Sequence, residues 1–402
     1  MKSIIIKVAS AIIKFIGWFI PQNKKAWFCI PGITNQMKMD LLNYTNESIL
    51  SLMHHICTFH NDENIKIFLV IYTKERYKEL KDFIDHLKNI KIDFVFVDKN
   101  KFSIIQRLHY YICFYSSKYI LVYSPFERHL KLKKQVAICI NYYVPFKLDL
   151  IHNQKKNNID YVIMSSNIAC QIDSIATSIP YSKYRYLGLP KEDHIINPRF
   201  SKNELFKRVG IHENIKKIVL YAPTHRDYER INAIGRSIFG YDGDYDSLNK
   251  ILIKHNAKMI VKLHYAQEKK HILYTNDFSN IQLYQSTYEY TVDDILPYVD
   301  LLITDYSSIS FDFMLTGKPI IYNFFDREVY EKARGFSWNP VEIICVGPIV
   351  KTKQELETAI DNNLSNENNI ITGKYEWVRQ LTHAYSDGGA CERIYLFLKQ
   401  LM

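Results

Sequence analysis

The segment from Val299 to Pro319 reads VDLLITDYSSISFDFMLTGKP and contains two patterns in succession. Its short apolar run, Leu301–Ile303, is typical of a buried strand in a parallel sheet, and the polar residues Thr304–Ser308 follow it directly. Apolar residues then occur on nearly all sides of the helical projection until Gly317, a residue that commonly ends helices. The segment therefore predicts a strand, a polar turn and a buried helix of about ten residues.

The turn Asp305–Ser308 lies where the predicted strand passes into the predicted helix. The first N–H groups of a helix have no intrahelical partners, and here they come beside the hydroxyls of Ser307 and Ser308. At the carboxyl edge of an open α/β sheet, where ligands bind, such a helix start also carries partial positive charge. The turn therefore predicts an anion site, and the alternative is that one serine only caps its own helix.

The composition indicates a globular protein. A chain of 402 residues corresponds to two or three domains, and 47% apolar residues are enough for large cores. The formal charge of +10 suits nucleic acid, an anionic membrane surface or a phosphorylated substrate, and does not select among them. The seven cysteines are scattered without a CxxC pair, which indicates reduced core thiols in a cytoplasmic protein rather than disulfides or a zinc site.

Apolar β-type runs alternate with helical patterns along the chain, which predicts an α/β protein with mostly parallel sheets. The strand-like runs of the first half are Ala26–Ile30, Ile65–Tyr72, Phe94–Val97, Tyr119–Tyr123, Val136–Ile140 and Tyr161–Met164, with helical patterns at Asn46–Phe59, Lys74–Leu87 and Phe102–Tyr115. Those of the second half are Ile218–Tyr221, Lys258–Leu263, Ile281–Tyr284, Leu301–Thr304, Pro319–Phe324 and Ile343–Val346. A turn-rich stretch at Gly188–Asp193, followed by a helical pattern at Ser201–Val209, marks the boundary. We therefore expect two Rossmann-like domains, at 23–195 and 196–402, facing a central ligand cleft.

Residues 1–22 predict an N-terminal amphipathic helix. Five small or polar residues fall on one narrow stripe of the helical projection, and Ile, Phe and Ala cover the rest; the five are Ser3, Lys7, Ser10, Lys14 and Gly17. The lysines interrupt the apolar run and no small-residue cleavage site follows it, so the pattern fits neither a signal peptide nor a clean membrane span. Docking on a membrane surface suits such a helix, and packing on the protein's own first domain is the alternative.

Polar residues follow four strands of the second predicted sheet. They are Thr224, Arg226 and Asp227 after the first strand, His264 after the second with Lys262 two residues earlier on the same strand face, Asp305, Ser307 and Ser308 after the fourth, and Asp326 and Arg334 after the fifth. Arginine offers a planar fork for phosphate, and histidine can neutralise negative charge or protonate a departing oxygen. Singly, each loop has a structural explanation, such as an ion pair or a histidine bonded to backbone. Together, at one sheet edge, they predict a basic pocket for a nucleoside diphosphate.

These motifs resemble those of the CDP-glycerol glycerophosphotransferases, which include the teichoic-acid primases and polymerases and relatives in capsule synthesis. The resemblance covers roughly residues 188–393. The motifs that carry it, in chain order, are Tyr221–Asp227, Lys262–His264, Asp294–Leu296, Asp300–Ser308, Lys318-Pro319, Asp326, Tyr330, Arg334-Gly335, Gly347-Pro348 and Asp387-Gly388.

The resemblance implies a GT-B fold whose C-terminal half binds a CDP-glycerol-type donor. It also implies transfer of a polyol phosphate to the hydroxyl of a lipid-linked or polymeric acceptor, with release of CMP, by a peripheral enzyme at the cytoplasmic face of a bacterial membrane. By that likeness His264 is the donor-side histidine, and Arg226, Ser307 and Ser308 hold the pyrophosphate. The hypothesis is in-line attack on the β-phosphorus, with Lys262 also stabilising the negative charge. No carboxylate cluster demands a divalent ion.

The first half departs from the family pattern at one position. Asn141–Lys147 reads NYYVPFK where family members have Trp-His-Gly-Thr-Pro-Leu-Lys, so Tyr142 stands in place of the histidine that is taken as the base. A phenol, with a reference pKa of about 10, is a poor base at neutral pH. Three interpretations remain open: Lys147 activates Tyr142, Asp149 or His152 serves instead, or a loose transition state needs no strong base.

Two other functional classes fit the same predicted fold. One is a GT-B glycosyltransferase that uses a sugar nucleotide, and nucleotide release from CDP-glycerol or from UDP-sugars separates the two. The other is a non-catalytic scaffold that binds a nucleotide or polyanion, for which we expect binding without release of CMP. Nucleic-acid binding is not expected, because the basic residues follow the predicted pocket loops and do not form one stripe of a helix.

Overall fold

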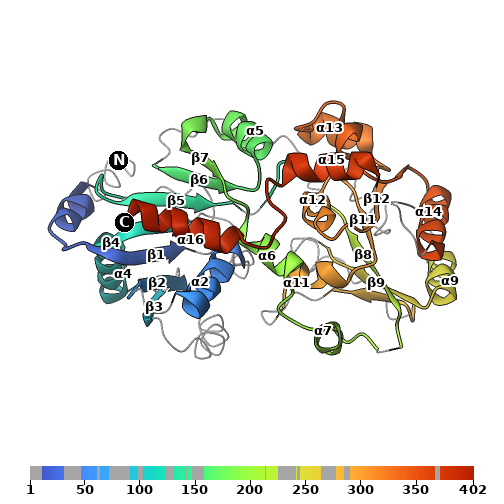
Figure 1. Cartoon of the computed structure of the whole chain (residues 1–402), viewed down its shortest axis with the longest axis horizontal. Helices are drawn as coiled ribbons and strands as arrows, with labels where there is room; N and C mark the ends of the chain where they lie inside the picture. Colours follow the sequence, from blue (N-terminus) through green and yellow to red (C-terminus); the bar gives the residue numbers. More distant parts are fainter. Residues whose placement is uncertain are drawn as a thin grey trace. The chain divides into compact units, whose positions relative to one another are not determined.

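The structure is a computed structural model that describes residues 11–30, 47–60, 64–71, 91–97, 103–122, 131–141, 143–146, 158–212, 214–224, 241, 245–263, 278–284, 290–366 and 372–402. The chain forms two compact units. The first comprises Met1–Tyr142, Ile151–Lys191 and Gly389–Met402, and the second comprises Tyr143–Leu150 and Glu192–Gly388. Each unit contains one parallel sheet with helices packed on it (Figure 1).

The sheet of the first unit has seven strands in the order β3-β2-β1-β4-β5-β6-β7. The strands are β1 (Asn23–Ile30), β2 (Lys66–Ile71), β3 (Lys91–Phe96), β4 (Ser117–Val122), β5 (Val136–Ile140), β6 (Tyr161–Met164) and β7 (Tyr184–Tyr186). The helices are α2 (Glu47–Phe59), α4 (Ile104–Ser116), α5 (Asn167–Thr177), η3 (Tyr181–Lys183) and α16 (Ala390–Leu401), together with a helix at residues 11–18.

The sheet of the second unit has six strands in the order β10-β9-β8-β11-β12-β13. The strands are β8 (Lys217–Ala222), β9 (Ala257–Val261), β10 (Ile281–Leu283), β11 (Leu301–Thr304), β12 (Ile320–Asn323) and β13 (Ile349–Val350). The helices are α6 (Pro190–Ile196), α7 (Lys202–Val209), α9 (Asp246–Lys254), α11 (Val292–Ile295), η5 (Leu296–Tyr298), α12 (Ile309–Met314), α13 (Arg327–Arg334), η6 (Val341–Ile344), α14 (Lys353–Ser365) and α15 (Gly373–Thr382). Helix α6 begins just before the chain enters this unit.

Both sheets are doubly wound. In each, the first strand lies in the interior, the next two strands extend to one side, and the later strands extend to the other. This order creates a switch point beside the first strand, between β1 and β4 in one sheet and between β8 and β11 in the other. The predicted α/β class with two parallel Rossmann-like sheets is confirmed.

The core of the first unit explains why the strands read as continuous apolar runs. On one face, alternate residues such as Trp27 and Ile67 join a cluster with residues of α2 and α16. On the opposite face, Phe28 contacts Tyr110 and Phe114 of α4, with ring centroids 5.1 and 5.3 Å apart. Helices therefore cover both faces of the sheet, so both sets of alternating side chains must be apolar.

The prediction of core thiols is confirmed, because all seven cysteines are buried and free. Burial raises the pKa of Cys57 and of Cys113 to about 11. These thiols therefore stay protonated at neutral pH and act as small apolar core groups.

One predicted strand is wrong. Ile343–Val346 has a β-type composition, but its first residues belong to the 3₁₀ helix η6, and the last strand of the sheet is β13. The reason is Gly347, where a Cβ atom would lie 1.8 Å from the carbonyl oxygen of Ile320. The chain reaches the edge of β12 at this glycine and can pair only beyond it, where Tyr322 donates to the carbonyl of Pro348 at 2.9 Å.

The division between the units differs from the predicted one in two places. Helix α16 returns to the first unit, where Ile394, Tyr395 and Leu398 belong to its core. The short segment Tyr143–Leu150 belongs to the second unit. Neither exchange has a local sequence signal, because both depend on contacts between residues far apart in the chain. The predicted helix at Lys74–Leu87 lies outside the described residues.

Candidate active site

The switch point of the second sheet is closed by direct hydrogen bonds between two predicted site residues. Strands β8 and β11 pair in parallel, and Thr304 Oγ1 donates to the carbonyl of Ala222 at 2.7 Å. Immediately beyond, one oxygen of Asp305 accepts from the Thr224 amide at 2.8 Å and from its hydroxyl at 2.6 Å. Both residues are buried. Asp305 therefore holds the start of the loop after β8 against the turn after β11.

Tyr306 fixes the turn to the core of the second unit. Its ring is fully buried and stacks on Tyr330 of α13, with centroids 4.2 Å apart, and it also contacts Phe324. Its hydroxyl donates to Asp326 Oδ1 at 3.1 Å. Asp326 thus contacts the turn through Tyr306. Tyr330 packs α13 against the same Tyr306 ring, and the last turn of α13 carries the half-buried Arg334. The sequence prediction did not include Tyr306, although a large aromatic residue inside a polar turn was a usable signal.

The two serines of the turn keep their hydroxyls out of the local hydrogen-bond network. Ser307 and Ser308 are half-buried, and neither hydroxyl bonds to any residue that the structure describes. Ser308 precedes α12 with helical φ and ψ of −63° and −12° and makes no side-chain capping bond. The backbone carbonyls do take part, because the carbonyl of Ser307 accepts from the amide and hydroxyl of Ser310 at 3.2 and 2.9 Å. The alternative, in which one serine caps the helix through its side chain, is not observed.

Helix α12 is shorter than predicted, with six residues in place of about ten. It ends at Met314, and the chain continues through Leu315–Gly317 in turn conformation, where Gly317 has a φ of 67°. A short helix contributes little macrodipole. The capacity of this turn to hold an anion therefore rests on the serine hydroxyls and on the backbone amides at the helix start.

The neighbouring strand ends bring further polar groups to the same edge of the sheet. Lys262 follows β9 and is half-buried, and its amide donates to the carbonyl of Tyr221 at 2.8 Å. Asn323 ends β12, and its side-chain oxygen accepts from the Tyr241 hydroxyl at 2.5 Å. Burial, assisted by the negative charges of Glu355 and Asp326, raises the pKa of Tyr241, so its hydroxyl remains a donor. The pair formed by Asn323 and Tyr241 was missed, because no local spacing joins the two positions.

The predicted edge is therefore real in the described part of the second unit. Lys262, Thr224, Asp305 and Asn323 lie at the carboxyl ends of four strands that are neighbours in the sheet. The other site candidates lie outside the described residues: Arg226, Asp227, His264, Tyr142 and Lys147, and with them Asp149 and His152. Their roles remain predictions.

The described residues Tyr143–Phe146 pack against other residues of the second unit, to which they belong. The Trp338 indole donates to the carbonyl of Pro145 at 2.8 Å, and the Ser337 amide donates to the carbonyl of Phe146 at 3.0 Å. The ring of Phe146 lies 5.5 Å from that of Phe311, three residues after Ser308. Of this stretch, the described residue Phe146 thus contacts the helix that follows the serine turn.

Sequence comparisons place these features in a family. A sequence model described as CDP-Glycerol:Poly(glycerophosphate) glycerophosphotransferase matches residues 72–400. The teichoic acid glycerol-phosphate primase of Bacillus subtilis (strain 168) is 29% identical over 260 residues, which are 64% of this chain and 62% of that protein. The teichoic acid poly(glycerol phosphate) polymerase of the same organism is 32% identical over 211 residues, 52% of this chain and 27% of that protein. The chain thus spans less than two thirds of the length of these relatives.

Two solved structures show the same fold. The wall teichoic acid polymerase TagF superposes with a TM-score of 0.72 and 17% identity, covering 99% of this chain and 95% of that chain. A putative UDP-N-acetylglucosamine 2-epimerase from Listeria monocytogenes gives a TM-score of 0.56 and 14% identity, covering 94% and 97%. At these identities the likeness concerns the fold, and it confirms the GT-B-like class.

Proposed function

Because the chain belongs to the CDP-glycerol:poly(glycerophosphate) glycerophosphotransferase family, we propose that it transfers a polyol phosphate from a CDP-polyol to an acceptor hydroxyl. Glycerol phosphate is the proposed group, and a lipid-linked or polymeric cell-surface glycan is the proposed acceptor. The observation that carries the proposal is the switch point of the second sheet. There Thr224 and Asp305 fix two loops beside the hydroxyls of Ser307 and Ser308, which bond to none of the residues that the structure describes.

In the proposed reaction, the acceptor oxygen attacks the β-phosphorus of the donor in line with the bond to CMP. That bond breaks, CMP leaves, and the acceptor proton passes to a base or to water. The turn at Ser307 and Ser308 holds the pyrophosphate, and Lys262 supplies positive charge. Arg226 and His264 stabilise the charge that develops on the transferring and leaving oxygens. No metal-dependent step is required by this scheme.

On the acceptor side, Tyr142 and Lys147 are the proposed residues. The support is the packing of Tyr143–Phe146 against residues of the second unit, among them Phe311 of α12. The variant Tyr142→Phe tests whether Tyr142 acts as the base or the loose transition state needs no base. A base role predicts a loss of about 10²-fold or more in kcat, and positioning alone predicts a smaller loss with a change in KM for the acceptor.

The proposed setting is the cytoplasmic face of a bacterial membrane, and the first unit offers a surface for it. In the helix at 11–18 and just beyond, Ile12, Phe15, Ile16 and Phe19 are 53–69% exposed. Gly17, from the predicted polar stripe, is buried instead, and a Cβ there would lie 2.5 Å from the ring of Tyr115 in α4. The apolar side of this helix therefore faces outward, which favours membrane docking over packing on its own domain.

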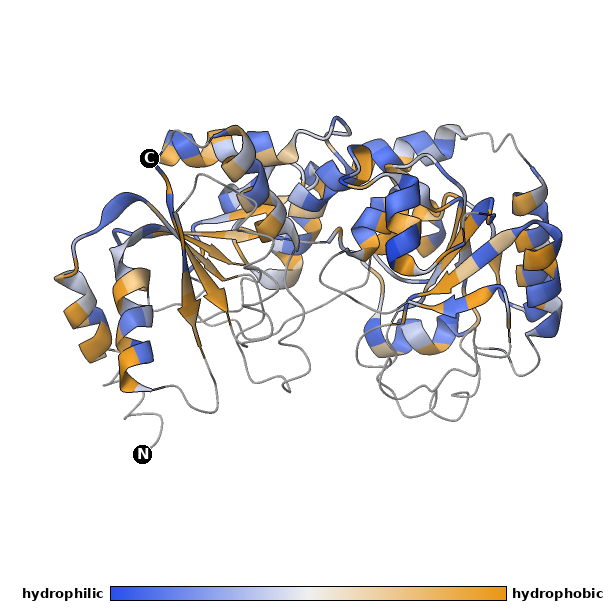
Figure 2. Ribbon diagram, turned by 90° about the horizontal axis from the view of Figure 1, so that it is seen from below, coloured by the Kyte–Doolittle hydropathy of each residue, from blue (hydrophilic) through white to orange (hydrophobic). Residues whose placement is uncertain are grey.

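Helix α4 extends this outward apolar face. It lies beside the helix at 11–18, and its exposed apolar residues recur with helical spacing: Ile104, Ile105, Leu108 and Ile112 (Figures 1 and 2). Exposed basic residues occur on α4, at Arg107, and at the start of the strand that follows the first helix, at Lys24 and Lys25. An apolar face flanked by cations suits the interface of an anionic bilayer. Among the described residues, no helix is both long enough and apolar enough to cross a membrane.

The proposed activity is tested with purified full-length protein and separate donors. CDP-glycerol, CDP-ribitol and UDP-sugars are each incubated with a panel of membrane-lipid acceptors, and nucleotide release is followed by chromatography. We expect acceptor-dependent CMP release from a CDP-polyol. Release of UDP instead indicates the glycosyltransferase class, and CDP-polyol binding without CMP release from any acceptor indicates a scaffold.

The membrane surface is tested by vesicle sedimentation. We expect binding to anionic vesicles to exceed binding to neutral ones and to weaken with salt. The double variant Leu108→Ser/Ile112→Ser should lose most of this binding while keeping its melting temperature, because both side chains are exposed. The matched control Ile253→Ser removes an apolar side chain of similar exposure, 53%, from α9 of the second unit. Equal binding by all three proteins would contradict the assignment.

A further inference from the structure

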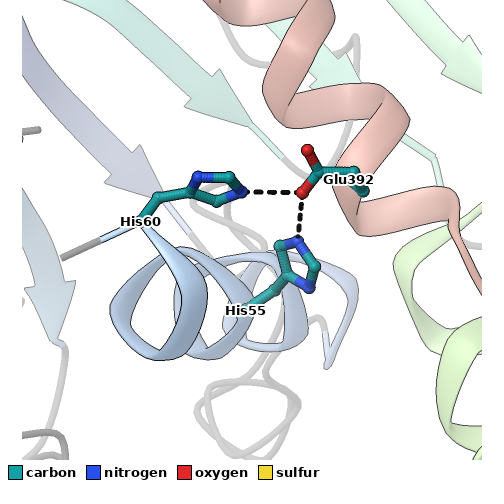
Figure 3. Close-up of side chains that lie close together, drawn as sticks. All are labelled: His55, His60 and Glu392. Atoms are coloured by element: carbon teal, nitrogen blue, oxygen red, sulfur yellow. Dashed lines mark hydrogen bonds and ion pairs between the residues drawn. The ribbon is translucent and has the colours of Figure 1, made fainter.

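Two helices that cover the same face of the first sheet bring three metal-ligand side chains together. His55 lies on α2, His60 lies one residue beyond its end, and Glu392 lies in the first turn of α16 (Figure 3). The Nε2 atoms of His55 and His60 are 2.8 and 2.7 Å from the same oxygen of Glu392. The three potential ligand atoms all lie within 4.8 Å of one another.

Neighbouring aromatic rings hold both imidazoles in place. The His60 ring stacks on Tyr395 of α16, with centroids 3.7 Å apart and planes 21° apart, and Tyr395 itself is buried in the core. The His55 ring packs on Phe59 at 4.9 Å. The backbone also fixes the end of α2, because the His60 amide donates to the carbonyl of Ile56 at 2.9 Å. The site is therefore preorganised on two packed helices.

Exposure and the kinds of donor group both suit a cation. The side chains of His55, His60 and Glu392 are 20%, 21% and 40% exposed, so solvent reaches the cluster. Imidazole nitrogens and carboxylate oxygens are both ligand types that divalent transition metals accept.

We propose that His55, His60 and Glu392 form a binding site for a divalent transition metal of the zinc class. Two imidazole nitrogens and one carboxylate oxygen are a ligand set that zinc accepts, with a fourth position left to water. Tetrahedral bonds of about 2.0–2.2 Å would hold the ligand atoms about 3.3–3.6 Å apart. The Glu392 oxygen therefore has to move away from each nitrogen by less than about 1 Å, and the two nitrogens, now within 4.8 Å of each other, have to reach the same spacing. The bound ion would join α2 to α16, and so fasten the C-terminal segment to the first unit.

This site is separate from the proposed transfer chemistry. Its three residues belong to the first unit, whereas the serine turn and the strand ends beside it belong to the second. The inference therefore stands whether or not the proposed transferase activity is found. The metal's role is structural, and its test uses binding and stability rather than turnover.

The chain contains a matched control pair. His255 Nε2 lies 2.6 Å from Asp361 Oδ1, a histidine–carboxylate contact like those of Glu392. The third group at that oxygen is the ammonium of Lys254, at 2.7 Å, which is a cation and not a metal ligand. His255→Gln should therefore leave metal binding unchanged.

The experiment uses the full-length chain, freed of any affinity tag and dialysed against a chelator. Cobalt(II) is titrated while visible absorption is recorded, and zinc is then added as competitor. We expect one cobalt per chain with the d–d bands of a four-coordinate ion, displaced by an equimolar amount of zinc. His60→Gln and Glu392→Gln should weaken binding at least tenfold. A glutamine at position 60 can still donate a hydrogen bond to Glu392, so its effect separates ligation from simple contact.

Thermal unfolding followed by circular dichroism provides the second readout. Zinc should raise the melting temperature of the wild type and of His255→Gln, and should not raise that of His60→Gln or Glu392→Gln. The unfolding curve also shows directly whether each variant is folded. Absence of stoichiometric cobalt binding to the wild type, or unchanged binding in both ligand variants, would overturn the proposal and leave only a hydrogen-bonded contact between α2 and α16.

Discussion

Two strand-to-helix turns in this molecule contain a pair of serines, and they use them differently. In the first unit, Ser165 and Ser166 follow β6, and Ser166 is buried, extended and accepts from the Ala169 amide as the cap of α5. In the second unit, Ser307 and Ser308 lie at the end of the turn after β11, are half-buried, and make no capping bond to α12. The two extra residues between strand and serines, Asp305 and Tyr306, make the difference.

The contrast teaches what separates a structural turn from a candidate ligand site. Where the serines follow the strand directly, a serine hydroxyl accepts a hydrogen bond from the first turn of the helix and caps it. Where Asp305 binds the neighbouring loop and Tyr306 is anchored in the core, the turn is held without the serine hydroxyls. The variants below test this contrast from the largest expected effect to the smallest.

The largest effect is expected from His264→Ala. If the chemistry belongs to the strand ends of the second unit, loss of the imidazole should lower kcat by about 10²–10⁴-fold. Turnover is measured as CMP release, and circular dichroism verifies folding. His255→Gln, at the residue that follows α9 and contacts Asp361, is the matched control and should keep wild-type turnover. Wild-type kcat in His264→Ala would remove this histidine from the mechanism.

The double variant Ser307→Ala/Ser308→Ala comes next. It should lower kcat/KM for the CDP-polyol by about 10²-fold, because two hydroxyl donors to the pyrophosphate are lost. Its melting temperature should stay within about 2 °C of the wild type, because within the described part of the chain neither hydroxyl makes a hydrogen bond. A large loss of stability with unchanged kcat/KM would mean that the two turns work alike.

Asp305→Ala should affect both stability and activity. It removes the acceptor of two hydrogen bonds from Thr224 in a buried site, which costs about 1–3 kcal/mol of unfolding free energy. Urea denaturation measures this loss, and kcat/KM for the donor should fall as well, because the loop after β8 is released. Thr224→Val, which removes only the hydroxyl bond, should show a smaller loss of stability. If both variants matched the wild type, Asp305 would have no positioning role.

Ser166→Ala should have the smallest effect. Loss of the side-chain cap of α5 should lower the unfolding free energy by about 1 kcal/mol, measured by urea denaturation. Activity should not change, because this serine serves its own helix. A drop in kcat/KM here, comparable to that of the Ser307/Ser308 variant, would erase the distinction between the turns.

The sequence predicted what periodicity and local chemistry control. The strands were predicted because runs such as Leu301–Thr304 are buried on both faces, and the shared edge followed from their parallel order. The composition of Ile343–Val346 was misleading, because the contact between Gly347 and the backbone of β12 decides where pairing begins. The length of α12 was overestimated, because the apolar residues after Met314 are core residues in a turn.

The remaining site contacts join residues with no periodic relation. Tyr306 meets Asp326 across two loops, and Tyr241 meets Asn323 from a different part of the chain. Glu392 is 337 positions from His55. Such pairs depend on the topology of the whole fold, so a motif search along the chain does not detect them.

The return of α16 to the first unit also orders events during synthesis. Gly389–Met402 leave the ribosome after the whole of the second unit, yet Ile394, Tyr395 and Leu398 complete the first unit's core. The nascent first unit must therefore wait, with one face of its sheet only partly covered, while the second unit is made and can fold. The first unit is thus translated first, but its core is completed last.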